Sequence, residues 1–207
     1  MANKITFGLT GNICSGKSTI AKTFYDNNII TVDADMVARQ VVELGTRGLT
    51  RIMDTFGGQY LQPDGTLDRA KLGELVFTDK KAMTALNGIM GPLIEEEGAK
   101  QIKKLHDAGH LIVGWNAAIL CEAGNADKYR PLIVAHCTPE QQLVRLMKRG
   151  TGHGPLTREQ AMSRINSQMP AKQKMLMADF VIDTSSSIEE SIKQTQSIIE
   201  ILKQSTK

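Results

Sequence analysis

ITFGLTGNICSGKSTIAKTF, residues 5–24, joins a short apolar run to a glycine-rich turn and then to a helix-like segment. Its middle, residues 11–18, matches the pattern Gly-x-x-x-x-Gly-Lys-Ser/Thr at every fixed position. Residues 5–9 predict a buried strand, and residues 19–24 predict a helix that continues from the turn. A strand, this turn and a helix in that order are typical of a loop that binds phosphate.

The residue types of this turn suit phosphate chemistry. Glycines let the backbone turn its N–H groups around a phosphate, and the following helix N-terminus adds positive potential. Lys17 would bridge the β- and γ-phosphates of ATP, and Ser18 would ligate Mg²⁺. The alternative is a glycine-rich turn that binds nothing, and we favour the phosphate loop because both flanks fit. We expect ATP contacts at Gly11, Asn12, Ile13, Cys14, Ser15, Gly16, Lys17, Ser18 and Thr19.

Four more short apolar runs follow at residues 29–32, 111–113, 132–135 and 180–182. Brief, nearly all-apolar strands are typical of parallel sheets that are buried on both faces. Together with residues 5–9 they predict an α/β fold of three layers around a five-stranded parallel sheet. We expect residues 1–207 to form a single domain.

Between residues 57 and 109 the sequence shows no strand pattern. Residues 70–77 and 80–106 predict helices. This stretch therefore indicates a helical insertion on the α/β core, at about residues 57–109, that faces the substrate.

A second helical region follows the fourth strand. Thr138, Pro139 and Gln141 predict a capped helix start, and the helix should end near Arg149. Residues 150–155 are rich in glycine and predict a mobile loop, after which Thr157 and Gln160 form a second capping pattern. We expect a lid at about residues 145–170.

Composition excludes several classes of protein. Of the 207 residues 41% are hydrophobic and 23% are charged, which excludes disorder, and a net charge of +3 is too small to indicate nucleic-acid binding. The three cysteines are far apart and indicate a reducing compartment, so we expect a cytoplasmic protein. No apolar run is long enough for a membrane span, and no histidine–cysteine pattern predicts zinc.

Two aspartates follow the second strand, at positions 33 and 35. Ligands bind at the carboxyl ends of parallel strands, so a carboxylate here could accept a proton from an attacking hydroxyl. The alternative is a helix cap, because residues 36–39 look helical. For Asp33 the cap and the chemical role are equally plausible from the residues alone.

Arg145, Lys148 and Arg149 form the basic end of the helix that Thr138 begins. Arg145 and Arg149 are four residues apart and share a helix face, so both could reach a transferring phosphoryl group. The alternative is a stabilising placement of cations at a helix C-terminus. Without further information, the residues favour the second interpretation.

Two other side chains stand near these signals. Trp115 could stack on a purine or serve as a core aromatic, and the core is the commoner outcome. Cys14 lies in the phosphate loop, where a lowered pKa is physically conceivable, but we interpret it as loop filler.

The sequence as a whole resembles the dephospho-coenzyme A kinase family. The stretches that carry the resemblance are GLTGNICSGKS (8–18), DADMVARQVV (33–42), residues 86–94, QLVR (142–145) with Arg149, and ADFVID (178–183). The resemblance implies a P-loop kinase fold and ATP-dependent phosphorylation of the ribose 3′-hydroxyl of dephospho-coenzyme A, with Mg²⁺. It further implies Asp35 as general base, catalytic roles for Lys17 and Arg145, and an ATP contact at Arg149. Asp33, Asp35 and Arg39 would bind the acceptor, and the helical insertion would be the coenzyme A-binding domain.

The chain departs from this family pattern at three positions. Gly91 precedes Pro92 where the family usually has histidine, and Asn116 stands where the family has an aspartate after its third strand. The nearest base before residues 178–179 is Lys174, where the family often has arginine. These three departures fall in or near the parts of the family pattern that serve the acceptor and the metal. The phosphate loop matches the family pattern.

Two alternatives to this function stay open. The same scaffold could phosphorylate another nucleotide or nucleoside, or the chain could be an ATP-binding regulatory protein without kinase activity. In each case we expect a small-molecule ligand, no nucleic-acid or membrane partner, and a monomer or weak homo-oligomer.

Overall fold

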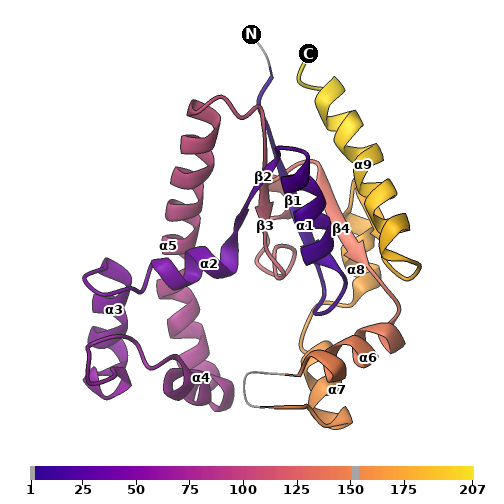
Figure 1. The fold of residues 1–207 in the computed structure, drawn as a ribbon. Helices are drawn as coiled ribbons and strands as arrows, with labels where there is room; N and C mark the ends of the chain where they lie inside the picture. Colours follow the sequence, from indigo (N-terminus) through magenta and orange to yellow (C-terminus); the bar gives the residue numbers. More distant parts are fainter. Residues whose placement is uncertain (1–2, 151–153) are drawn as a thin grey trace. The chain divides into compact units, whose positions relative to one another are not determined.

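A five-stranded sheet in the order β2-β3-β1-β4-β5 forms the centre of the fold, and the ladders from β3 through β1 and β4 to β5 are parallel (Figure 1). The computed structural model describes residues 3–150 and 154–207. The strands are β1 Ile5–Gly11, β2 Ile30–Asp33, β3 Ile112–Asn116, β4 Leu132–His136 and β5 Phe180–Asp183. All five predicted strands are confirmed, and several extend into polar residues that an apolar pattern does not mark.

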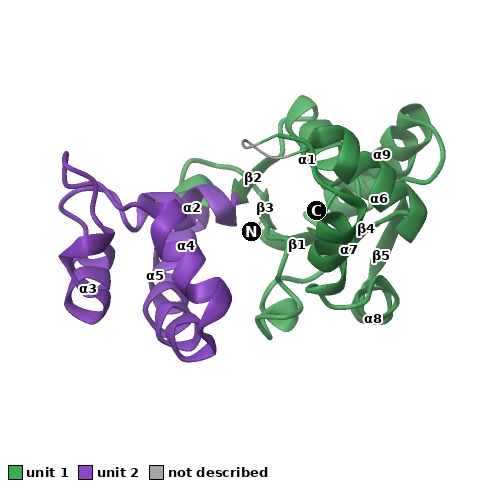
Figure 2. Cartoon of the chain, turned by 90° about the horizontal axis from the view of Figure 1, so that it is seen from below, with its two compact units in different colours: residues 1–32, 104–207 green, residues 33–103 purple. Residues whose placement is uncertain are grey.

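The described chain divides into two compact units (Figure 2). Unit 1 comprises residues 1–32 and 104–207, and unit 2 comprises residues 33–103. Unit 1 carries the helices α1 Lys17–Asp26, α6 Pro139–Arg149, α7 Arg158–Asn166, α8 Ala171–Met177 and α9 Ile188–Gln204, with the short turn η2 Ala126–Lys128. Both capping boxes predicted from the sequence are confirmed, at Thr138 with Gln141 and at Thr157 with Gln160.

The main core of unit 1 lies between the sheet and the pair α1 and α9. Phe7 and Leu9 of β1 are fully buried there against Ile20 and Phe24 of α1, and α9 adds Ile199. On the other face of the sheet, Gly8 leaves space for the side chains of Leu120 and Leu132 and for the Tyr129 backbone, because a Cβ at Gly8 would lie 2.8–3.0 Å from them. This packing fixes β1, and therefore the turn that follows it, from both sides.

Unit 2 is helical. It contains α2 Ala34–Gln40, α3 Arg47–Phe56, η1 Gly58–Tyr60, α4 Arg69–Thr78 and most of α5 Lys80–Asp107. The helices predicted at 70–77 and 80–106 are thereby confirmed. A separate core forms around Leu49, Ile52 and Leu72, which are at most 4% exposed.

Within residues 3–150 and 154–207, no helix is long and apolar enough to cross a membrane. Residues 151–153, in the loop predicted to be mobile, lie outside the described residues.

Candidate active site

The turn between β1 and α1 has the backbone of a phosphate-binding loop. Gly16 adopts φ +86°, which favours glycine, directly before the first residue of α1. A Cβ at Gly11 would lie 2.5 Å from Ser15 Oγ and 2.7 Å from the Ala135 carbonyl oxygen, so only glycine fits there. The loop therefore closes tightly against β4 and leads into the N-terminus of α1, where an anion could bind.

Lys17 is held at the end of β3. Its Nζ donates a hydrogen bond of 2.7 Å to Oδ1 of Asn116, which is only 5% exposed. Asn116 is the position where the family pattern has an aspartate. The neutral amide of Asn116 thus helps to position the lysine ammonium at the end of β3.

Arg145 contacts the same loop. Its Nη2 donates to the Thr184 carbonyl oxygen at 2.6 Å, and its Nη1 lies 3.2 Å from Thr184 Oγ1 and 3.5 Å from the Cys14 carbonyl oxygen. Arg149, one turn further along α6, is exposed. The structure therefore brings Arg145 to the phosphate loop, whereas a position at a helix end alone would not require these bonds.

The structure separates the two interpretations of Cys14 and those of Trp115. Burial raises the pKa of the Cys14 thiol above its usual range, although Arg149 and Arg145 act against this, so Cys14 is not an activated thiol. Trp115 is 4% exposed and stacks on Tyr129 with ring centroids 5.6 Å apart, which confirms the core interpretation.

Asp33, Asp35 and Arg39 belong to unit 2 and lie at the start and along the length of α2. The Asp33 side chain caps this helix, accepting hydrogen bonds from the backbone N–H groups of Asp35 and Met36 at 2.8 and 3.3 Å. The carboxylate of Asp35 is on an exposed residue in the first turn. The capping interpretation is confirmed for Asp33. Asp35 is exposed, and its role as general base stays a prediction.

The donors of the loop suit a nucleoside triphosphate with its magnesium ion. Ser18 is exposed in the first turn of α1, next to Lys17. No group of three His, Cys, Asp or Glu side chains among the described residues is arranged to hold a metal ion. Mg²⁺ commonly binds through substrate phosphates and few protein ligands, so a single hydroxyl beside a phosphate loop fits this ion.

Lys174, the third departure from the family pattern, has its charged group inside the protein. It is fully buried, and its Nζ lies 2.8 Å from Glu122 Oε1 and 2.8 Å from the Ala118 carbonyl oxygen. The base nearest to the position where the family often has arginine is therefore paired inside the protein. Its charge is neutralised inside the protein.

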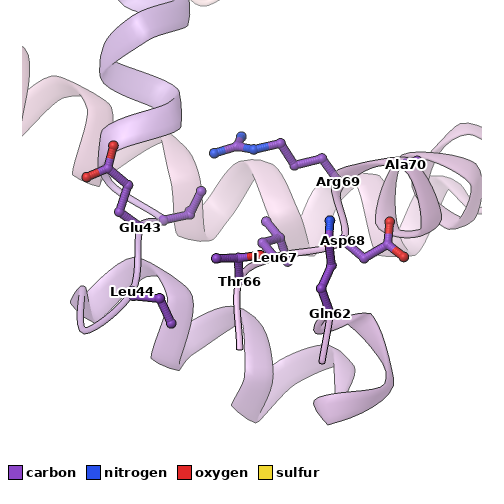
Figure 3. Close-up of a pocket in the computed structure, with 9 residues that line it drawn as sticks. Glu43, Leu44, Gln62, Thr66, Leu67, Asp68, Arg69 and Ala70 are labelled. Carbon is purple, nitrogen blue, oxygen red and sulfur yellow. The ribbon is translucent and has the colours of Figure 1, made fainter. Parts of the chain in front are cut away.

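Unit 2 carries a hollow of about 650 Å³ between the α2–α3 link and the start of α4, and Figure 3 shows its lining. Glu43, Asp68 and Arg69 supply charged groups, and Arg69 Nη2 donates to the Arg39 carbonyl oxygen at 3.0 Å. A volume of this size is typical of small-molecule pockets. Gly91, the first departure from the family pattern, lies on α5, and a Cβ added there would meet no atom of another element within 4 Å.

The sequence did not mark Thr184 as part of the site. Its hydroxyl donates to the Ser15 carbonyl oxygen at 2.8 Å, and it follows β5 directly. Thr184 could have been predicted from its place at the carboxyl end of a parallel strand, because ligands bind at that edge of the sheet, where the loop also lies.

Comparison with known proteins agrees with this geometry. The family model for dephospho-CoA kinase matches residues 5–190. A dephospho-CoA kinase from Listeria innocua is 42% identical over 195 residues, covering 94% of this chain and 96% of the relative. The solved dephospho-CoA kinase of Campylobacter jejuni has a TM-score of 0.72 at 26% identity, covering 96% of this chain and 98% of that one. A solved structure from Thermus thermophilus has a TM-score of 0.80 at 26% identity, covering 96% and 97%. The chain therefore belongs to the dephospho-CoA kinase family.

Proposed function

We propose that this protein transfers the γ-phosphoryl group of ATP to the ribose 3′-hydroxyl of dephospho-coenzyme A. The observation that carries the proposal is the intact phosphate loop, with Lys17 and Arg145 both hydrogen-bonded in place, in a chain that matches this family over residues 5–190. A protein that only sensed ATP would not require Arg145 or Asp35.

The residues of unit 1 act on the phosphates. The backbone N–H groups of the loop and the N-terminus of α1 bind the β-phosphate, and Lys17 bridges the β- and γ-phosphates. Thr19 adds a contact in the first turn of α1. Arg145 and Arg149, at the start of the segment that we predicted as a lid at about residues 145–170, contact the phosphates, where Arg145 stabilises the charge that develops during transfer.

A magnesium ion, when bound, neutralises phosphate charge and helps to align the transferring group. Ser18 would be its protein ligand. Because Asn116 contributes no negative charge, the ATP phosphates themselves would supply the anionic ligands.

The residues of unit 2 act on the acceptor. Asp35 accepts the proton of the attacking 3′-hydroxyl, and Asp33 holds the start of α2, so that it orients Asp35 and Arg39. The helical segment that we predicted at about residues 57–109 would bind the coenzyme A part of the acceptor. Arg69 supports this role, because its guanidinium lines the hollow of unit 2 and could pair with an acceptor phosphate.

A coupled ADP-release assay tests the proposal. The acceptors are dephospho-coenzyme A, nucleosides, nucleoside monophosphates and deoxynucleoside monophosphates, each with ATP and Mg²⁺. We expect release with dephospho-coenzyme A and little with the others. Release with another nucleotide would transfer the assignment to that acceptor, and binding of ATP without acceptor-dependent release would favour a regulatory protein.

A further inference from the structure

Two glutamine side chains hold the backbone of Ile13 inside the phosphate loop. Gln168 Oε1 accepts a hydrogen bond from the Ile13 N–H at 2.7 Å, and Gln142 Nε2 donates to the Ile13 carbonyl oxygen at 3.0 Å. A backbone N–H can only donate and a carbonyl can only accept, so the backbone itself fixes which amide atom faces it. One glutamine thus acts as acceptor and the other as donor on the same residue.

The two bonds fix two successive peptide groups. The N–H of Ile13 belongs to the peptide between residues 12 and 13, and its carbonyl belongs to the peptide between residues 13 and 14. In a trans peptide the carbonyl and the N–H point in opposite directions. Because Gln142 holds the Ile13 carbonyl, the N–H of Cys14 points away from Gln142.

The next peptides of the loop are held in a similar way. The Ser15 carbonyl accepts from Thr184 Oγ1 at 2.8 Å, which directs the N–H of Gly16 away from Thr184. The N–H of Ser15 donates to the Asn12 carbonyl at 3.0 Å and closes the turn. Side chains from other elements thus contribute to the shape of the loop.

Gln168 is itself anchored. It lies two residues beyond α7, and its neighbour Met169 accepts from Asn12 Nδ2 at 3.0 Å and donates from its N–H to Glu122 Oε1 at 3.1 Å. Glu122 is held in turn by Lys174, which is fully buried. The Lys174–Glu122 pair therefore supports the segment that presents Gln168.

Gln142 is equally constrained, because it is 3% exposed on α6. Helices α6 and α7 share a small core of Leu143, Leu146, Ala161 and Ile165, against which Ile13 and Cys14 pack. The two glutamines therefore come from two elements that are packed together and against the loop.

We propose that Gln142 and Gln168 are positioning residues for phosphoryl transfer, which clamp the peptides on either side of Ile13 and so form the loop before ATP binds. The proposal rests on the proposed function for its catalytic meaning. In this arrangement the Ile13 N–H donates to Gln168 and does not bind a phosphate. Pre-organisation of this kind lowers the cost of ordering the loop when nucleotide binds.

The opposite roles of the two glutamines allow a sharp test with one substitution. Glutamate keeps an acceptor oxygen but loses the donor, so Gln168→Glu should preserve the bond to Ile13 whereas Gln142→Glu should break it. Both variants add the same charge beside the loop, so a simple charge effect would weaken nucleotide binding in both. Gln142→Met removes the donor without a charge, in case Gln142→Glu fails to fold.

The measurements are the affinity for ADP by calorimetry, the KM for ATP with dephospho-coenzyme A, and the exchange rate of the Ile13 amide in nucleotide-free protein by NMR. Gln168→Ala should weaken ADP binding and raise the KM for ATP about tenfold, the effect of one lost hydrogen bond, and should speed exchange of the Ile13 amide. Gln168→Glu should restore slow exchange. Gln142→Met should weaken ADP binding to a similar extent. Gln173→Ala and Gln173→Glu, at an exposed position on α8, are matched controls and should behave as wild type.

Two results would overturn the clamp. One is a Gln168→Ala protein with unchanged ADP affinity and unchanged Ile13 exchange, and the other is an equal effect of Gln168→Glu and Gln142→Glu. ADP affinity and amide exchange need no acceptor, so the clamp can succeed or fail independently of whether dephospho-coenzyme A is the substrate.

Discussion

In unit 1 some polar side chains of the site bond to buried groups far away in the sequence, as Lys17 does to Asn116 and Thr184 does to Ser15. In unit 2 the corresponding groups are exposed. Asp35 and Arg39 lie on one short helix, and Glu96 pairs with Arg47 and Lys100 at the surface. Exposed ion pairs contribute little to geometry or stability.

This difference indicates how the two substrates are handled. Buried, long-range hydrogen bonds set the ATP side in advance, while an exposed helix presents the groups for the acceptor. Substitutions at the site residues of unit 1 should therefore change phosphoryl transfer, because these residues are held in fixed positions. Substitutions at the site residues of unit 2 should change the reaction of the acceptor and leave the affinity for ATP unchanged.

The largest effect is expected for Lys17→Ala. Turnover should fall by about 10³-fold or more, because the variant loses the cation that bridges the phosphates, while the melting temperature stays near that of wild type. Lys22→Ala on the same helix is the control, since Lys22 forms only an exposed pair with Asp26. Normal turnover in Lys17→Ala would remove the phosphate-loop assignment.

Asp35→Asn tests the catalytic role of unit 2, and its effect should again be a loss of turnover. Turnover should fall by about 10²- to 10⁴-fold, the contribution of a positioned general base, with unchanged ATP affinity. Asp33→Asn separates the roles of the two carboxylates, because asparagine caps a helix as well as aspartate does. Steady-state kinetics of both variants decide the assignment, and a crippling Asp33→Asn beside a mild Asp35→Asn would reverse it.

Arg145→Ala should reduce kcat by about 10²-fold and affect ATP binding less, because the guanidinium acts on charge that develops in the transition state. Lys148→Ala, an exposed cation of the same helix, should have near-normal kinetics. If Arg145→Ala changed only the melting temperature, Arg145 would be a helix-end cation and no part of the active site.

The smallest expected effect is on the pH dependence of protein stability, and it arises at the start of β4. Burial raises the pKa of Asp179, but the Leu132 N–H and Arg130 lower it more strongly, so the pKa lies below its usual range. A carboxylate with a lowered folded-state pKa stabilises the protein above its unfolded pKa of about 3.9 and loses this as the pH falls through the folded value. Asp179→Asn should therefore lower the melting temperature at pH 7, and the difference from wild type should shrink below about pH 4.

Asp54→Asn, at an exposed position on α3 of unit 2, is the control for this measurement. It should leave the pH profile of the melting temperature unchanged. A constant difference between Asp179→Asn and wild type across the acid range would show that the Asp179 charge does not matter.

Sequence patterns predicted the parts of this protein that depend on local chemistry. The strands follow from short apolar runs, and the helix starts at Thr138 and Thr157 follow from capping residues three positions apart. The phosphate loop is visible because a tight turn around an anion demands glycines at fixed spacing.

The contacts behind the loop were not predictable in the same way. Thr184, Gln142 and Gln168 reach the loop from 129–169 residues away. Nothing local distinguishes the two glutamines from other polar residues. Lys174 shows the same limit, because its partner Glu122 lies 52 positions earlier in the sequence and becomes a neighbour only in the fold.

The Lys174–Glu122 pair also constrains how this protein can evolve. Loss of the carboxylate alone would leave a buried ammonium without its counter-charge, at a cost of about 3 kcal/mol or more, against a total stability of about 5–15 kcal/mol for a typical domain. A lineage that replaces either residue therefore passes through a poorly folding intermediate unless both positions change together. Among descendants of this sequence, positions 122 and 174 should be retained or exchanged as a pair.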